Sequence, residues 1–168
     1  MPLSMHQASV PVFTQGLTGL RIVLGKAAAH VEARGIDPTA LLTARLYPDM
    51  FHFTRQVVAA SEFARGCAAR LAGQEPAPYD GDDTSFAGLT ARLEAALAYV
   101  ATFDAAAVDG SEGREITLQR RDGPVVMTGQ AYLLAQSLPH FFFHVTTAYD
   151  ILRHNGVEVG KKDYLGIS

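Results

Sequence analysis

Apolar residues recur at intervals of three and four positions along most of the chain, the spacing that gathers them on one face of an α-helix. This pattern predicts a long first helix from about Met5 to Ala33, with Pro11 marking a kink or its effective start. A short helical piece is expected over residues 39–43, and a longer helix over Pro48–Leu71. The first half of the chain is therefore predicted to be mainly helical.

The middle of the chain contains a loop and a third long helix. Residues 73–83 are rich in Pro, Gly and acidic side chains, which predicts a surface connection rather than a boundary between domains. Asp83, Thr84 or Ser85 can cap the helix that follows, because each carries an oxygen that accepts hydrogen bonds from free backbone N–H groups. The helical spacing then continues to about Thr102, which predicts a third helix.

A hairpin and a fourth helix are expected in the last third of the chain. Residues 114–119 and 124–128 are short β-prone segments on either side of the turn Asp122-Gly123, which is typical of a small β-hairpin. The last helix is expected over Gln130–Asn155, kinked or restarted at Pro139. The tail beyond this helix is predicted to be extended.

These elements predict an all-α fold, an antiparallel four-helix bundle with the hairpin between its third and fourth helices. A length of 168 residues suits one domain, which is expected over residues 1–168. A core of that size needs neither disulfides nor a structural metal to fold. Binding sites in such bundles form between facing helices, so candidate residues are sought there.

The composition narrows the class of partner. The chain has 17 acidic and 14 basic residues, and the basic ones form no stripe with aromatic residues, so no nucleic-acid partner is expected. No apolar run reaches the length of a membrane span and no secretory signal pattern opens the sequence. The cytoplasm is the predicted location, with no membrane partner. Cys67 is the single cysteine, which fits a reducing compartment and a packing role.

Two histidines provide the clearest candidate chemistry. His140 and His144 are four positions apart, so on a helix their rings lie one turn apart on one face and can bind one metal ion. His52, in the second long helix, is the best candidate for a third ligand. Three histidines with an open fourth position are typical of a catalytic metal site. The alternative is that the histidines are hydrogen-bonded members of an aromatic core, because Phe141–Phe143 separate them.

The histidine pair His140 and His144 is part of a longer sequence pattern. After His140 and His144 come Leu152-Arg153 and Gly156, with Val145-Thr146-Thr147 between them. In this pattern the chain resembles the DinB and YfiT-like superfamily of bacterial four-helix bundles, although that superfamily commonly has an Arg-Gly-Gln type run in place of Val-Thr-Thr. Nearly the whole chain is similar to an uncharacterised branch, the bacterial domain-of-unknown-function family numbered nineteen ninety-three. The similar segments are Arg45–Met50, Ala69–Gly73, Leu138–Tyr149, Ile151–Gly156 and Gly160–Tyr164.

The resemblance implies a homodimeric bundle that holds a divalent metal, Zn or Ni, and opens to a small pocket. The superfamily's known enzymes are metal-dependent thiol transferases and isomerases, in which the metal lowers the pKa of a bound water or thiol. Relatives supply their third ligand from a position that corresponds to Gln56 or Val57, so Gln56 is an alternative to His52. The branch usually has Asn at the position of His140.

A protein of a different class is compatible with the same residues. It is a metal-free homodimer that binds a small ligand or acts in a stress response without catalysis, its histidines hydrogen-bonded inside the bundle. The sequence leaves open whether the protein is an enzyme, and the presence of a stoichiometric metal separates the two classes.

Overall fold

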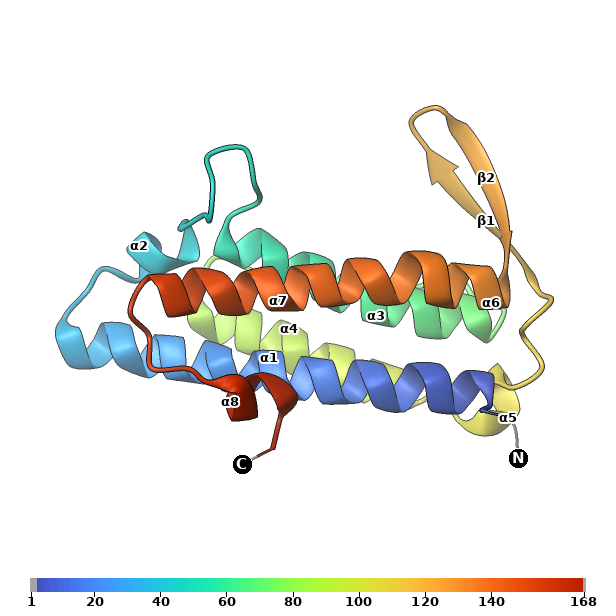
Figure 1. Ribbon diagram of the computed structural model, residues 1–168, viewed down its shortest axis with the longest axis horizontal. Coiled ribbons are helices and arrows are strands. Elements are labelled where there is room, and N and C mark those ends of the chain that lie inside the picture. The colour runs from blue at the N-terminus through green and yellow to red at the C-terminus, as the bar shows by residue number, and fades with distance from the viewer. Residues whose placement is uncertain (1–2, 168) are drawn as a thin grey trace.

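Four long helices lie side by side along the longest axis of the computed structural model, which describes residues 3–167 (Figure 1). Their apolar faces form one continuous core, in which Phe13, Phe53 and Phe141 are the bulkiest fully buried side chains. No helix within these residues is long and apolar enough to cross a membrane. The four helices are α1 (Met5–Arg34), α3 (Phe53–Leu71), α4 (Phe86–Val100) and α7 (Leu138–His154).

The first helix closely matches its predicted bounds. The hydroxyl of Ser4 accepts from the N–H of Gln7 at 3.2 Å, and the Oε1 of Gln7 accepts in turn from the N–H of Ser4 at 3.4 Å. At the other end Gly35 adopts the left-handed conformation with a φ of 62°. Pro11 lies inside α1, so the helix begins at the Ser4 cap and not at the proline.

The second long helix begins later than predicted. After the short helix α2 (Pro38–Leu42), the chain forms a loop in which the N–H of Phe53 donates to the carbonyl of Ala44 at 2.9 Å. Pro48 disfavours helical backbone in the residue before it, and the bond back to Ala44 closes the loop. The predicted helical start at Pro48 is therefore wrong, and α3 begins at Phe53.

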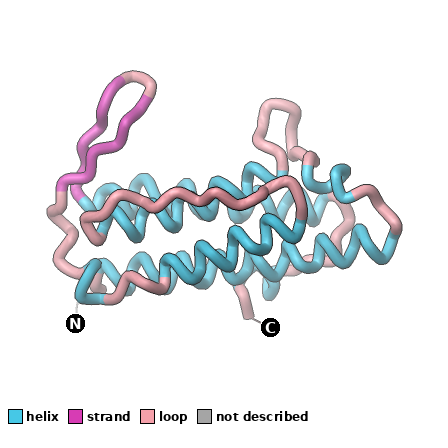
Figure 2. The backbone as a smooth tube through the Cα atoms, turned by 180° about the vertical axis from the view of Figure 1, so that it is seen from behind, coloured by secondary structure: helices cyan, strands magenta, loops and turns pink. Residues whose placement is uncertain are grey.

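Helices α3 and α4 run in the same direction. Their first residues are in contact, because the Phe53 ring lies 6.4 Å from that of Phe86. Residues further along both helices are also in contact, because the Arg65 guanidinium lies 4.9 Å from the ring of Tyr99. Residues 72–85 connect the two helices by returning along the length of the molecule (Figure 2). The predicted antiparallel arrangement is therefore wrong for this pair, because the connection is long enough to span the helices.

The hairpin lies between α4 and α7 in the sequence, after a short helix α5 (Ala105–Val108), and it projects from one end of the molecule (Figure 1). Its strands β1 (Glu115–Arg120) and β2 (Gly123–Thr128) pair antiparallel, with Arg120 opposite Gly123. Gly123 has a φ of 112°, a conformation that other residues rarely adopt. The turn residues are Arg121 and Asp122, one position before the predicted turn Asp122-Gly123, and Gly123 is the first residue of β2.

The last helical segment changes its winding just before Pro139. A short helix α6 (Gly129–Ala131) passes into the π-helix η1 (Tyr132–Ser137), and α7 starts at Leu138. A proline has no N–H for the carbonyl four residues earlier, and the wider π-turn accommodates this loss. Gly156 then ends the segment with a φ of 84°, as predicted.

The chain beyond α7 folds back onto α1. The predicted extended tail is wrong for its last part, which forms the helix α8 (Lys161–Leu165). The carboxylate of Asp163 accepts from the N–H of Gly160 at 2.8 Å and pairs with Lys26 of α1 at 2.8 Å. These tertiary contacts fix a helix that is too short to be stable alone. Ser168 lies outside the described residues.

Candidate functional site

A buried polar contact joins α3 to α7. His144 and Gln56 are 7% and 1% exposed, and the His144 Nδ1 lies 2.7 Å from the Gln56 Oε1. The amide nitrogen of Gln56 donates to the carbonyl of Phe51 at 3.0 Å, which turns its oxygen toward the imidazole. Because that oxygen accepts only, Nδ1 of His144 carries the hydrogen and Nε2 carries the free lone pair.

The surroundings of His144 keep its ring neutral. Burial lowers its pKa from 6.5 to about 4, and the nearby positive charge of Arg55 and the neighbouring His140 act in the same direction. At neutral pH the imidazole therefore presents an unprotonated Nε2. This is the form of histidine that binds a metal ion or accepts a proton.

The second histidine of the pair lies on the same side of α7. His140 is exposed, and its ring stacks on the ring of Phe63 at 4.8 Å between centroids. The His144 ring lies 5.6 Å from the same phenyl ring and 6.3 Å from that of Phe51. The spacing of four positions thus brings both imidazoles against one aromatic side chain of α3, as the helix geometry predicts.

His52 has a local role at the start of α3. It is the residue that caps the helix, and its Nδ1 accepts from the backbone N–H of Arg55 at 3.4 Å. Across residues 3–167 no three His, Cys, Asp or Glu side chains lie close enough together to hold a metal ion. The structure therefore brings His140 and His144 together and places Gln56 on His144, but it does not gather His52 with them. The physical reason is that the backbone before Phe53 is a loop and not the predicted helix.

Comparison with known proteins identifies the family. A family model described as "Domain of unknown function (DUF1993)" matches residues 5–165. The chain belongs to this family. The DUF1993 chain is also similar to a solved structure, described as the crystal structure of a DinB family member protein from Shewanella denitrificans, with 38% sequence identity and a TM-score of 0.87. That match covers 97% of this chain and 92% of the other. No curated protein matches the chain.

The comparisons confirm the DinB-like resemblance of this DUF1993 protein over nearly its whole length. In the sequence, only this resemblance points to Gln56, because it implies that the third ligand of relatives lies near that residue. The residue types alone did not single out Gln56, since an amide side chain is not a typical metal ligand in a histidine pattern.

Proposed function

We propose that this DUF1993 protein binds a divalent metal ion between α3 and α7 through His140 and His144. The observation that supports the site most strongly is the 2.7 Å contact between Gln56 and His144. A histidine that binds a metal through one nitrogen usually donates the hydrogen of its other nitrogen to an oxygen, which fixes the ring. Gln56 is placed to do this for His144, and its own amide is held by the Phe51 carbonyl.

The residues present fit a site with two protein ligands. The lone pair on Nε2 of His144 and the exposed imidazole of His140 suit Zn or Ni, which accept nitrogen ligands. The rings of Phe51 and Phe63 stack with that of His144, which is buried. A metal bound there would act as a Lewis acid that lowers the pKa of a bound water or thiol. By resemblance to the DinB-like enzymes, the reaction class would be a thiol transfer or an isomerisation.

Metal content and affinity test the proposal. We expect protein purified without an affinity tag to contain a divalent metal by elemental analysis, and to take up Zn²⁺ or Ni²⁺ in calorimetry once stripped. His140→Ala and His144→Ala should each abolish uptake, because one imidazole remains. Gln56→Ala should weaken it by ~10–100-fold, the usual effect of losing the group that orients a ligand.

His52→Ala is the matched comparison. Two-histidine binding predicts an affinity equal to that of the natural protein, whereas a strong loss would mean that His52 moves in to complete a three-histidine set. If neither ion binds with a stoichiometry near one per chain, the metal proposal is wrong.

A metal-free small-ligand-binding protein is the second candidate. It is favoured by the lack of a third His, Cys, Asp or Glu ligand within the described residues. In that case His140→Ala and His144→Ala lower the melting temperature without any metal being involved, since the histidines would then serve to stabilise the α3–α7 contact.

A further inference from the structure

A cavity of about 480 Å³ lies beside the histidine pair and has a different chemistry. It is lined by α3, α4, the connection between these two helices, strand β1 and the π-helix. Phe63 separates the two places, because it lines the cavity and also stacks on His140. The volume suits a small organic molecule. Four arginines line this cavity, namely Arg65, Arg70, Arg92 and Arg120.

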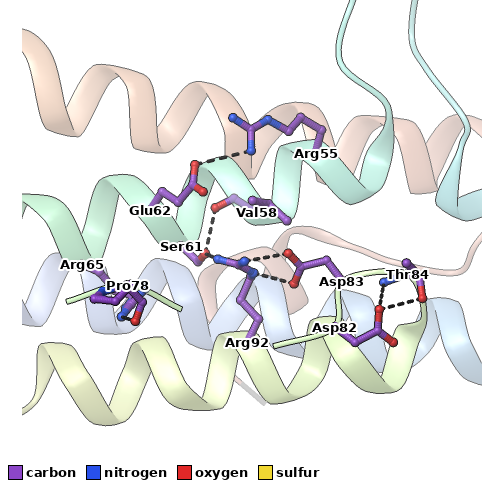
Figure 3. Close-up of polar contacts among 10 residues, drawn as sticks. All are labelled: Arg55, Val58, Ser61, Glu62, Arg65, Pro78, Asp82, Asp83, Thr84 and Arg92. Atoms are coloured by element: carbon purple, nitrogen blue, oxygen red, sulfur yellow. Dashed lines mark hydrogen bonds and ion pairs between the residues drawn. The ribbon is translucent and has the colours of Figure 1, made fainter. Parts of the chain in front are cut away.

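One of these arginines is neutralised within the protein. Arg92 donates to both carboxylate oxygens of Asp83 at 2.6 Å and to the hydroxyl of Ser61 at 3.2 Å (Figure 3). Such a two-point pair leaves little charge for a ligand. Arg92 therefore belongs to the wall of the cavity.

Arg65 is buried without a counterion. It is 8% exposed, and its Nη2 donates to the carbonyl of Ala77 at 2.9 Å. The same atom donates to the carbonyl of Pro78 at 3.3 Å (Figure 3). Its guanidinium also lies 4.9 Å from the ring of Tyr99. The Nε has no hydrogen-bond partner among the described residues, and no carboxylate there lies within ion-pair distance of this side chain. A buried charge without an opposite charge is costly unless a bound group compensates it.

Two more arginines are held by the π-helix. Arg70 donates through Nη1 to the hydroxyl of Tyr132 at 3.1 Å, and Arg120 donates through Nη2 to the Oε1 of Gln136 at 2.7 Å. Neither forms an ion pair with any carboxylate in residues 3–167. Both partners lie in the π-helix, a type of turn that is frequent at functional sites.

We propose that this cavity binds a small organic anion that carries a carboxylate or a phosphate group. Arg65, Arg70 and Arg120 bring three positive charges. Among the described residues one carboxylate lines the cavity, that of Glu62, and it lies 3.6 Å from the guanidinium of Arg55. The chain as a whole has a net charge of -3, so this excess of cations is local. Guanidinium groups bind carboxylates and phosphates through paired hydrogen bonds.

The other residues that line the cavity indicate what the uncharged part of the ligand is like. Phe63, Tyr79 and Leu118 contribute apolar or aromatic surface beside the arginines. Aromatic side chains and guanidinium planes stack on flat rings. The fitting class is therefore a flat or apolar molecule with one anionic group, and not a bare inorganic ion.

Calorimetric titration with benzoate, phenyl phosphate and the neutral benzamide tests the proposal. We expect saturable binding of at least one of the two anions and none of benzamide. The anion that binds more tightly identifies the preferred group. Arg70→Gln and Arg120→Gln should each weaken that binding by about tenfold, the range of a charge-assisted hydrogen bond. The two arginines lie on different elements, so the result does not depend on one variant folding.

Arg21→Gln is the matched control, because Arg21 pairs with Glu94 at 3.7 Å and does not line the cavity. It should bind the anion as the natural protein does. Circular dichroism checks that each variant is folded. Equal binding of benzamide, no saturable binding of either anion, or unchanged affinity in both folded arginine variants would overturn the proposal.

Discussion

His144 links the protonation of one side chain to the stability of the fold. Its pKa falls from 6.5 to about 4 in the folded protein, chiefly because of burial, so the unfolded chain binds a proton more readily than the native one. The neutral ring therefore contributes full stability above about pH 6.5 and loses it as the pH falls toward 4. The two pKa values imply a loss of up to ~3 kcal/mol in the free energy of unfolding, which urea titrations across this range can measure.

His144→Asn separates this effect from that of other titrating groups. The variant keeps a polar side chain that does not titrate, so its stability should fall less steeply between about pH 6.5 and pH 4. The difference between the two curves belongs to His144. Parallel curves for the natural protein and the variant would show that burial does not shift the protonation of this ring.

Single residues also show which features of the structure can be predicted from the local sequence and which cannot. The Ala-rich surroundings of Cys67 predict a packing role, and the thiol is fully buried, with burial raising its pKa to about 12. Such a thiol does not react readily, because the thiolate is the nucleophile. The contact of Gln56 with His144 joins residues 88 positions apart and depends on how α3 lies against α7. Local spacing does not determine that placement.

At the scale of elements, α8 is held against α1 by a close approach of backbones. A Cβ atom added at Gly19 would lie 2.0 Å from the carbonyl oxygen of Tyr164, which is backbone and cannot move aside alone. We therefore expect Gly19→Ala to destabilise the protein by ~1–3 kcal/mol, the usual cost of overpacking. It should also speed tryptic cleavage after Lys161 and Lys162, because α8 must move away from α1.

Gly25 provides the matched control in the same helix. A Cβ atom there meets nothing within 4 Å, so Gly25→Ala should raise the free energy of unfolding by ~0.5–1 kcal/mol through helix propensity alone. Thermal unfolding measures both variants. A Gly19→Ala protein as stable as Gly25→Ala would contradict the close packing of α8.

The elements that follow from local chemistry are those that the sequence predicts well. Gly35 and Gly156 end helices in the left-handed conformation, and Ser85, one of three candidate caps, accepts from the N–H of Gly88 at 3.0 Å. The start of α3 and the formation of α8 depend on tertiary bonds, such as Asp163 with Lys26. Such bonds leave no periodic signal in the sequence.

The arrangement of the whole molecule likewise depends on tertiary contacts that the sequence pattern does not predict. The helical pattern predicts four long helices, but the direction of α4 depends on the path of residues 72–85. That path also creates the cavity, because Ala77 and Pro78 lie over Arg65. The arginines are scattered in the sequence between positions 65 and 120, and the crossing connection brings them to one cavity. The histidine pair, in contrast, is local to one helix and could be found from spacing.

Self-association is a prediction for the whole molecule. The loop before α3 and one side of α7 form a groove lined by Leu46, Met50, Phe142 and Phe143, and Phe143 is 54% exposed. Apolar area removed from water gains ~25 cal/mol per Å², and two-fold dimers are the commonest assembly of identical chains. We expect light scattering at about 50 µM to report a dimer for the natural protein and a monomer for Phe143→Asp.

Leu134→Asp is the control for this interface, because Leu134 is 53% exposed on the π-helix and does not line the groove. A dimer that persists in Leu134→Asp and is lost in Phe143→Asp would place the interface on the groove, and a monomeric natural protein would contradict the prediction. The Phe143 ring lies 5.4 Å from that of His144, so a dimer formed there would cover one side of the proposed metal site. Metal affinity should then change with protein concentration, and it should lose that dependence in Phe143→Asp.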